Sequence, residues 1–147
     1  MKHIALYADF KGIALGLFTR NKRDKTMQLN KYKLVNPVSL LDVKKVIEVW
    51  KDENEIDTIV TNDEFFKEEL DDTTLIEQTS FNRDIMKFLT NINDKKFVFK
   101  SDIDKEIKKE LEIFEENTSV VNHVVYMIIL GMKYDGLGYE WMRELVG

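Results

Sequence analysis

The fold is decided by residues 3–18, which read His3-Ile-Ala-Leu-Tyr-Ala-Asp9-Phe-Lys-Gly12-Ile-Ala-Leu-Gly16-Leu-Phe18. An apolar run ends at Asp9, Gly12 follows three residues later, and a second apolar run begins at once. This pattern predicts a strand, a tight turn and an antiparallel return strand, with Asp9 exposed where the first strand ends. Two interpretations of Asp9 stay open: a carboxylate at which metal-dependent phosphoryl chemistry begins, or a side chain that only stabilises the turn.

The composition predicts one globular domain over residues 1–147. The chain is 44% hydrophobic and 33% charged, and it is long enough to bury a core. Its longest apolar window, Val124–Met132, is about half the ~18 residues that a membrane span needs. The apolar run after Lys2 is broken by Asp9 and Lys11, so no signal peptide is expected. The absence of cysteine excludes disulfides and thiolate metal sites and fits a cytoplasmic protein.

The pattern of strands predicts an antiparallel meander followed by parallel strands. A helix that starts at Pro37, or at Ser39 through a capping box with Asp42, separates the meander from the β-branched run at 56–61. A strand, a crossover helix and a strand in that order imply parallel pairing with the first strand. The expected strands are 3–9, 13–20, 28–35, 56–61 and 96–100.

The second half of the chain predicts mainly helices. A short helix through Leu70 is capped by Asn62 or Asp63, and 71–74 has the composition of a loop. The helix from about 119 to 134 is apolar nearly all round, which predicts a buried helix. The other expected helices follow Ser80, begin at a capping box over 101–104, and span 139–146.

Charge patterning gives one candidate nucleic-acid surface. The turn after the second strand is strongly basic, and two lysines follow on the next strand; together these residues are Arg20, Lys22, Arg23, Lys25, Lys31 and Lys33. They predict either contact with a phosphate backbone or an ordinary solvated hairpin. The net charge of −5 argues against a protein that coats nucleic acid non-specifically, but it does not exclude a nuclease with a local basic track.

The chain resembles the ribonuclease H-like superfamily, and within it the Holliday-junction resolvases of RuvC type and their YqgF-type relatives. The residues from Asp9 to Gly16 are similar to the family's first-strand motif. The residues from Asp57 to Phe66 are similar to the strand that ends in a catalytic glutamate before two aromatics. The residues from Val121 to Gly131 are similar to the buried last helix, which begins with acidic residues or a His–Asp pair.

The resemblance implies an α/β, ribonuclease H-like fold with a mixed five-stranded sheet flanked by helices. It also implies hydrolysis of phosphodiester bonds in branched DNA with Mg²⁺ or Mn²⁺, carried out by a homodimer. Three positions depart from the family pattern: the spacing from Asp9 to Gly12 is three, Asn62 stands where a catalytic glutamate is expected, and Asn122 and His123 replace a carboxylate. These departures keep an alternative open, namely a catalytically degenerate module that binds a protein or nucleic-acid partner.

The resemblance gives Asp9, Asp63, Glu64 and His123 as catalytic residues, and the same four with Asn122 as metal ligands. Asp63 has an alternative role as a helix N-cap, and Asn122 with His123 has one as a satisfied buried pair. Adjacent helical residues point about 100° apart, so one of this pair is expected to face Asp9, and His123 is preferred. His3 and Met127 are expected to serve packing only. The dimer contact is expected from an apolar patch, either Tyr139, Trp141 and Met142 or the pair Phe65 and Phe66.

Overall fold

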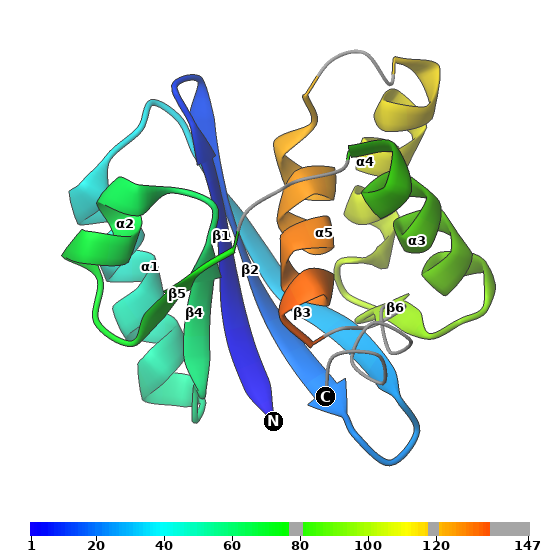
Figure 1. The fold of residues 1–147 in the computed structure, drawn as a ribbon, viewed down its shortest axis with the longest axis horizontal. Helices are drawn as coiled ribbons and strands as arrows, with labels where there is room; N and C mark the ends of the chain where they lie inside the picture. The colour runs from blue at the N-terminus through cyan, green and yellow to red at the C-terminus, as the bar shows by residue number, and fades with distance from the viewer. Residues whose placement is uncertain (77–80, 118–120, 136–147) are drawn as a thin grey trace.

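The computed structural model describes residues 1–76, 81–117 and 121–135. Within these residues six strands form one mixed sheet in the order β5-β4-β1-β2-β3-β6, and helices cover both of its faces (Figure 1). The strands are β1 (Lys2–Asp9), β2 (Gly12–Asn21), β3 (Thr26–Val35), β4 (Thr58–Thr61), β5 (Thr73–Leu75) and β6 (Phe97–Phe99). The helices are α1 (Leu40–Glu53), α2 (Glu64–Glu69), α3 (Phe81–Asn93), α4 (Asp104–Glu116) and α5 (His123–Asp135).

The centre of the sheet confirms the predicted meander and crossover. β1 and β2 pair antiparallel from Lys2 opposite Thr19 to Asp9 opposite Gly12, and β3 continues the meander. β4 pairs parallel with β1, with Ile4 opposite Ile59, as predicted for strands joined by a crossover helix. Asp9 therefore lies at the carboxyl end of a central strand.

The predicted number of five strands is wrong, because residues 71–74 were expected to be a loop. Thr73–Leu75 instead forms β5, which pairs parallel with β4 at the edge of the sheet. Its backbone is held by neighbours: the N–H of Ile59 donates to Asp72 O at 3.0 Å, and that of Ile76 donates to Thr61 O at 2.8 Å. A strand of three residues is too short to show the alternation of apolar and polar residues that predicts a strand from sequence. Its conformation is therefore determined by pairing with β4.

Two predicted helix starts are decided by hydrogen bonds. Ser39 is the N-cap of α1, and its hydroxyl accepts the N–H of Asp42 at 3.3 Å, so the start at Ser39 is correct. The capping box predicted from Ser101 is wrong: residues 101–103 form a turn and α4 begins at Asp104 without a side-chain cap. The N–H of Ile103 donates to Lys100 O at 3.0 Å, which closes that turn. Ser80 and the predicted helix at 139–146 lie outside the described residues.

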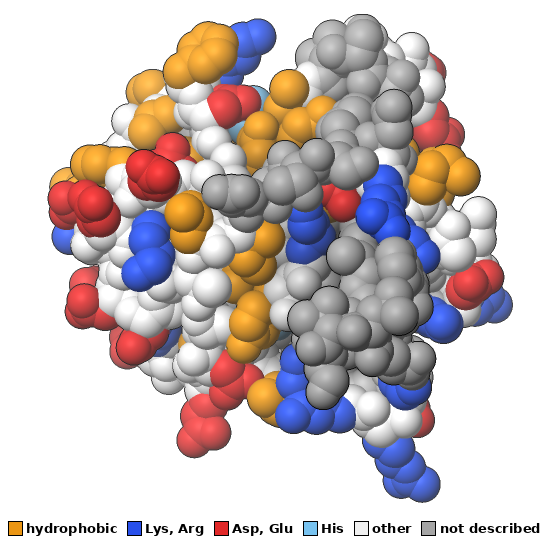
Figure 2. All heavy atoms as spheres, in the orientation of Figure 1, with side chains coloured by type: hydrophobic (Ala, Val, Ile, Leu, Met, Phe, Trp, Pro, Cys, Tyr) orange, Lys and Arg blue, Asp and Glu red, His pale blue; other side chains and the backbone are white. Residues whose placement is uncertain are grey.

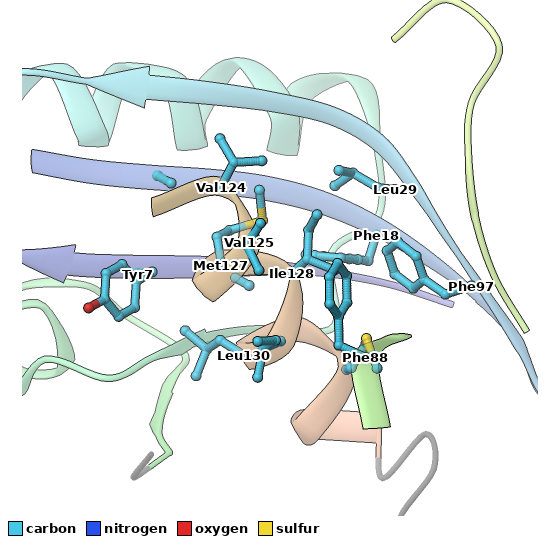
Figure 3. Close-up of a cluster of buried hydrophobic side chains, with 14 of the residues drawn as sticks. Tyr7, Phe18, Leu29, Phe88, Phe97, Val124, Val125, Met127, Ile128 and Leu130 are labelled. Carbon is cyan, nitrogen blue, oxygen red and sulfur yellow. The ribbon is translucent and has the colours of Figure 1, made fainter. Parts of the chain in front are cut away.

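The sheet divides the core into two layers. α1 and α2 cover one face, where Leu6, Ile47 and Trp50 are buried, while α3, α4 and α5 lie on the other face (Figure 1). On that second face α5 places Val124, Met127, Ile128 and Leu130 among aromatic side chains of the sheet (Figure 3). The predicted burial of the last main helix is confirmed over its described part. None of the described helices is long and apolar enough to span a membrane.

The distance between α5 and the sheet is set by glycine. A Cβ atom built on Gly131 of α5 would lie 2.5 Å from Cζ of Phe18, and one on Gly16 of β2 would collide with Sδ of Met127. On the same face His3 is buried, its ring stacks on Phe18 with centroids 5.0 Å apart, and its Nε2–H donates to Gly131 O at 3.0 Å. His3 and Met127 are thus packing residues, as expected, and His3 also links β1 to α5.

Candidate functional site

The hydrogen bonds of Asp9 fix the end of β1. Its Oδ1 accepts the N–H of Lys11 at 2.8 Å and that of Gly12 at 3.2 Å, so the carboxylate stabilises the hairpin turn. The same oxygen accepts Nε2–H of His123 at 2.8 Å, across 114 residues of sequence. Asp9 therefore holds both the turn and a titratable side chain from another element.

His123 reaches Asp9 because it is the first residue of α5. The helix packs along β1 and β2, and its amino end lies at the same end of the sheet as the β1–β2 turn (Figure 1). The side chains of His123 and Asp9 are 20% and 21% exposed, so the pair is shielded but open to solvent on one side. The expectation that His123 is the residue facing Asp9 is confirmed.

Two tyrosines that the sequence reasoning did not select complete this site. Tyr7 packs edge-on against the His123 ring at a centroid distance of 5.7 Å, and against Tyr126 at 5.3 Å. The signal was present in the spacing: Tyr7 lies two residues before Asp9 on the strand, and Tyr126 lies three residues after His123 on the helix.

Electrostatics at the site favours a charged Asp9. Partial burial alone raises the pKa of Asp9, but the hydrogen bonds from His123, Lys11 and Gly12 outweigh burial and leave that pKa below its ordinary value. Burial, followed by the nearby Asp9 charge, raises the pKa of Tyr7 to about 12. Burial also raises the pKa of Tyr126. Both tyrosines thus stay neutral while Asp9 is ionised at neutral pH.

Asn62 and Asp63, at the end of β4, have structural partners. Asn62 donates from Nδ2 to Ala8 O and accepts Ala8 N–H at Oδ1, both at 2.9 Å, which ties β4 to β1. Oδ1 of Asp63 accepts the N–H groups of Phe65 and Phe66 at 2.8 and 3.3 Å, so Asp63 is the N-cap of α2. Glu64 is the exposed first residue of that helix.

Asn122 is used at the start of α5. Its Oδ1 accepts the N–H of Val125 at 3.1 Å, and its Nδ2 donates to the backbone oxygen and Oε2 of Glu110, each at 3.3 Å. Asn122 thus closes the first turn of the helix that presents His123 and fixes it to α4. The structure does not bring its amide to Asp9 as a ligand.

The described residues do not bring together the ligands that a pair of divalent cations needs. Among them no three His, Asp or Glu side chains converge as a metal site. Two cations ~3.5–4 Å apart need several bridging carboxylates, whereas Mg²⁺ is commonly held by one or two carboxylates, substrate phosphate and water. Asp9 is able to supply one such carboxylate ligand, because the hydrogen bonds from Lys11, Gly12 and His123 all go to Oδ1 and none of them uses Oδ2.

The basic turn predicted to contact nucleic acid lies far from Asp9. β2 runs ten residues from Gly12, opposite Asp9, to Asn21, so Arg20, Lys22, Arg23 and Lys25 lie at the opposite end of the sheet. At roughly 3.3 Å per residue that separation is about 30 Å. Lys31 and Lys33 lie between the two ends on β3, and Lys31 forms a 3.0 Å ion pair with Glu53.

The surface beside Asp9 exposes aromatic side chains. Phe10, at the tip of the β1–β2 turn, is 89% exposed, and Nζ of Lys11 lies 5.7 Å from its ring centroid. Figure 2 shows hydrophobic, basic, acidic and histidine atoms close together at the top of the view, where Figure 1 places this turn. Phe65 is 52% exposed but Phe66 is 2% exposed, so the pair expected as an apolar dimer patch offers one ring. Tyr139, Trp141 and Met142 lie outside the described residues.

Comparison with known proteins identifies the fold. No family model and no curated protein matches the sequence. Among solved structures, the nuclease domain of the P22 large terminase superposes with a TM-score of 0.72 at 10% identity, covering 92% of this chain and 81% of that one. The nuclease domain of the bacteriophage SPP1 large terminase, solved with bound Mn, gives 0.55 at 12% identity, with 91% and 85% covered.

A resolvase shares the same architecture. The fowlpox virus Holliday junction resolvase gives a TM-score of 0.50 at 12% identity, covering 91% of this chain and 96% of that one. These likenesses, together with the meander, the crossover and the parallel β4, establish the architecture. The fold of this chain is ribonuclease H-like, and its resemblance to resolvases extends over most of its length.

Proposed function

We propose that this chain hydrolyses phosphodiester bonds in branched DNA at the site formed by Asp9 and His123. The observation that carries the proposal is the 2.8 Å hydrogen bond between a carboxylate at the end of a central strand and a histidine at the start of α5. Structural neighbours support it, since they include terminase nuclease domains and a resolvase solved in complex with Holliday junction DNA.

The chemistry follows from the orientation of the imidazole. When Nε2–H of His123 donates to Asp9, the neutral ring leaves Nδ1 as a proton acceptor. Nδ1 takes a proton from water, the water oxygen bonds to phosphorus, and the bond from phosphorus to the leaving oxygen breaks. That oxygen then receives the proton from the imidazolium, whose charge Asp9 stabilises meanwhile. Tyr7 packs against the ring and is itself backed by Tyr126.

A divalent cation would supply the remaining chemistry when bound, because Mg²⁺ and Mn²⁺ polarise phosphoryl oxygens. Asp9 is the residue proposed to hold it. Asp63 and Glu64 follow β4, which runs parallel to β1, so they lie at the same end of the strands as Asp9. They are therefore the next carboxylates to test. The bound Mn in the SPP1 terminase nuclease domain supports the choice of metal.

Cleavage of a synthetic four-way junction in Mg²⁺ or Mn²⁺ tests the proposal. We expect the variants Asp9→Asn and His123→Ala to lose at least about 100-fold in rate, the usual contribution of a positioned acid or base. Asp24→Asn, at the far end of the sheet, is the matched control and should cleave normally. Wild-type rates in either site variant, with circular dichroism showing intact folds, would exclude the Asp9–His123 site.

A second candidate is a catalytically degenerate module that binds DNA or a protein without cleaving. It is favoured by Asn62, which stands where the resemblance expects glutamate and uses both ends of its amide on Ala8. Calorimetric titration of Mn²⁺ separates the two candidates. Binding that depends on Asp9 supports the nuclease, whereas junction binding without any metal binding or cleavage supports the degenerate module.

The proposed DNA contact and dimer have separate tests. A junction has two symmetric cleavage points, so we propose a homodimer in which exposed Phe65 contributes to the contact. Sedimentation of wild type and Phe65→Ser measures this.

The basic turn, about 30 Å from Asp9, is proposed to contact one junction arm at roughly one DNA turn from the cleaved bond. The double variant Lys22→Glu/Arg23→Glu should then weaken junction binding and reduce its salt dependence.

A further inference from the structure

Part of the β3 strand has a free edge. β3 spans Thr26–Val35, but β6 pairs only with Met27–Leu29. Within the described residues, 30–35 therefore have a strand neighbour on one side only, which is β2. The main-chain N–H and C=O groups on such an edge are complementary to another extended polypeptide.

A groove runs along this free edge. It encloses about 400 Å³ between β3, α1 and α4. Val46, Val49 and Trp50 of α1 form an apolar wall, and Val49 is 52% exposed. Ile103, just before α4, and Glu106 of α4 form the opposite side, where Tyr32 donates its hydroxyl proton to Glu106 at 3.1 Å. Exposed aliphatic surface next to a free strand edge is typical of a site that receives a side chain from an added strand.

The charges around the groove are unbalanced. Lys31 is neutralised by Glu53 at 3.0 Å, but exposed Lys33 and Lys45 have no ion pair within the described part of the chain. Lys33 shares the α1 side of β3 with Val35, whose side chain is buried against that layer. Two uncompensated cations thus flank an apolar wall on a protein whose net charge is −5.

We propose that this groove binds an extended acidic segment of a partner protein, which adds to residues 30–35 of β3 as a further strand. Alternate side chains of that segment point toward α1, so the recognised pattern is acidic, apolar and acidic at every second position. The apolar side chain contacts Val46 and Val49, and the two carboxylates meet Lys33 and Lys45. Glu106 on the other wall repels carboxylates and so fixes which face of the segment carries them.

Two other occupants match the groove less well. DNA satisfies the lysines but has no alternating row of donors and acceptors to pair with a strand edge. Trp50 in the α1 wall is only 6% exposed, so it offers little ring surface for base stacking. A second copy of this chain that paired through the same edge would bring lysines against lysines. The inference does not depend on the nuclease proposal, because Lys33, Lys45 and Val49 are separate from Asp9 and His123.

The test uses labelled synthetic peptides of about ten residues, the upper end of ordinary strand lengths, so that they span the six-residue edge at 30–35 with flanking residues. One carries glutamate, valine and glutamate at alternate positions separated by serine; the others are a scrambled version and one with lysine in place of glutamate. Anisotropy should show binding of the first peptide only. Lys33→Glu/Lys45→Glu should weaken it about tenfold or more, and Val49→Asp should weaken it similarly. The matched controls, Lys22→Glu for charge and Leu41→Asp for an exposed apolar residue of α1, should leave it unchanged.

Amide hydrogen exchange provides the structural readout, and the bound peptide should slow exchange in residues 30–35. Binding should also survive in His123→Ala, which separates this site from the proposed active site. The proposal is overturned if no peptide binds or if residues 30–35 gain no protection. It is also overturned if the two groove variants, Lys33→Glu/Lys45→Glu and Val49→Asp, weaken binding of an oligonucleotide of equal charge as much as binding of the peptide. A change of sedimentation mass in Val49→Asp would overturn it in favour of a second copy.

Discussion

Acid should weaken the contact between β1 and α5 through His3. This side chain is 2% exposed, and burial is the largest influence on it, lowering its pKa from 6.5 to about 4. The hydrogen bond to Gly131 O and the charge of Asp57 act in the opposite direction, while Arg20 and the N-terminus lower the pKa further. The folded protein therefore holds a neutral ring under conditions in which the unfolded chain binds a proton.

The sign and size of the effect follow from proton linkage. Because the pKa is depressed in the folded state, the unfolded state binds more protons between pH 6.5 and about 4. The contribution of His3 to stability is then fully present above pH 6.5 and is lost as pH drops through this window. Lowering the pKa from 6.5 to about 4, at ~1.36 kcal/mol for each pH unit, reduces the free energy of unfolding by roughly 3 kcal/mol by pH 4.

Urea unfolding of wild type and His3→Gln at pH 7, 5.5 and 4 measures this contribution. Glutamine retains an N–H donor for Gly131 O but does not titrate. Between pH 7 and pH 4 the stability of His3→Gln should therefore fall by about 3 kcal/mol less than that of wild type, which is a difference of roughly 1–2 M in the urea midpoint. His123→Gln is the control for the other histidine. Parallel pH curves for wild type and His3→Gln would refute the reasoning, because they would mean that His3 is protonated equally in both states.

Three further predictions concern the site and its support. Asp9→Asn should flatten the acid side of the curve of stability against pH. The pKa of Asp9 is lowered in the folded protein, so the ionised carboxylate contributes stability above the ordinary carboxyl pKa, and this contribution is lost as pH falls through the folded-state pKa; thermal melts between pH 5 and 2 check this. Asp63→Ala should cost about 1 kcal/mol in urea unfolding through loss of the α2 cap, and Asp63→Asn should cost much less. Gly131→Ala should lower stability by about 1–3 kcal/mol, because the added methyl meets Phe18 at 2.5 Å, and Phe18→Leu should recover part of that loss.

The central fold was predictable because its signals are long and local. The apolar runs on either side of Asp9 and Gly12 have the length of two strands, and the period of α1 implied a crossover to β4. β5 was missed for the opposite reason, since its three residues take their conformation from pairing with β4. The start of α4 was misplaced because a serine in capping position predicts a cap only when its backbone is free to adopt one, and 101–103 instead form a turn.

The candidate site shows a similar division. His123 was selected by resemblance and helix geometry, and it does reach Asp9. The roles of Asn62 and Asn122 were beyond sequence reasoning, since an amide that cross-links two strands and one that caps a helix look the same in sequence as a weak metal ligand. Only the partner atoms distinguish these roles, and those atoms belong to Ala8, Val125 and Glu110.

The two interpretations of Asp9 are not exclusive, and this determines which variant tests the mechanism. One oxygen, Oδ1, receives Lys11 N–H, Gly12 N–H and the His123 ring, so the hairpin turn and the imidazole share a single anchor. Replacing Asp9 therefore disturbs the turn, the histidine and any cation together. Replacing His123 leaves both turn hydrogen bonds in place, so a loss of cleavage in His123→Ala with an unchanged melting temperature assigns the chemistry to the imidazole, whereas a lower melting temperature with full cleavage assigns His123 to packing alone.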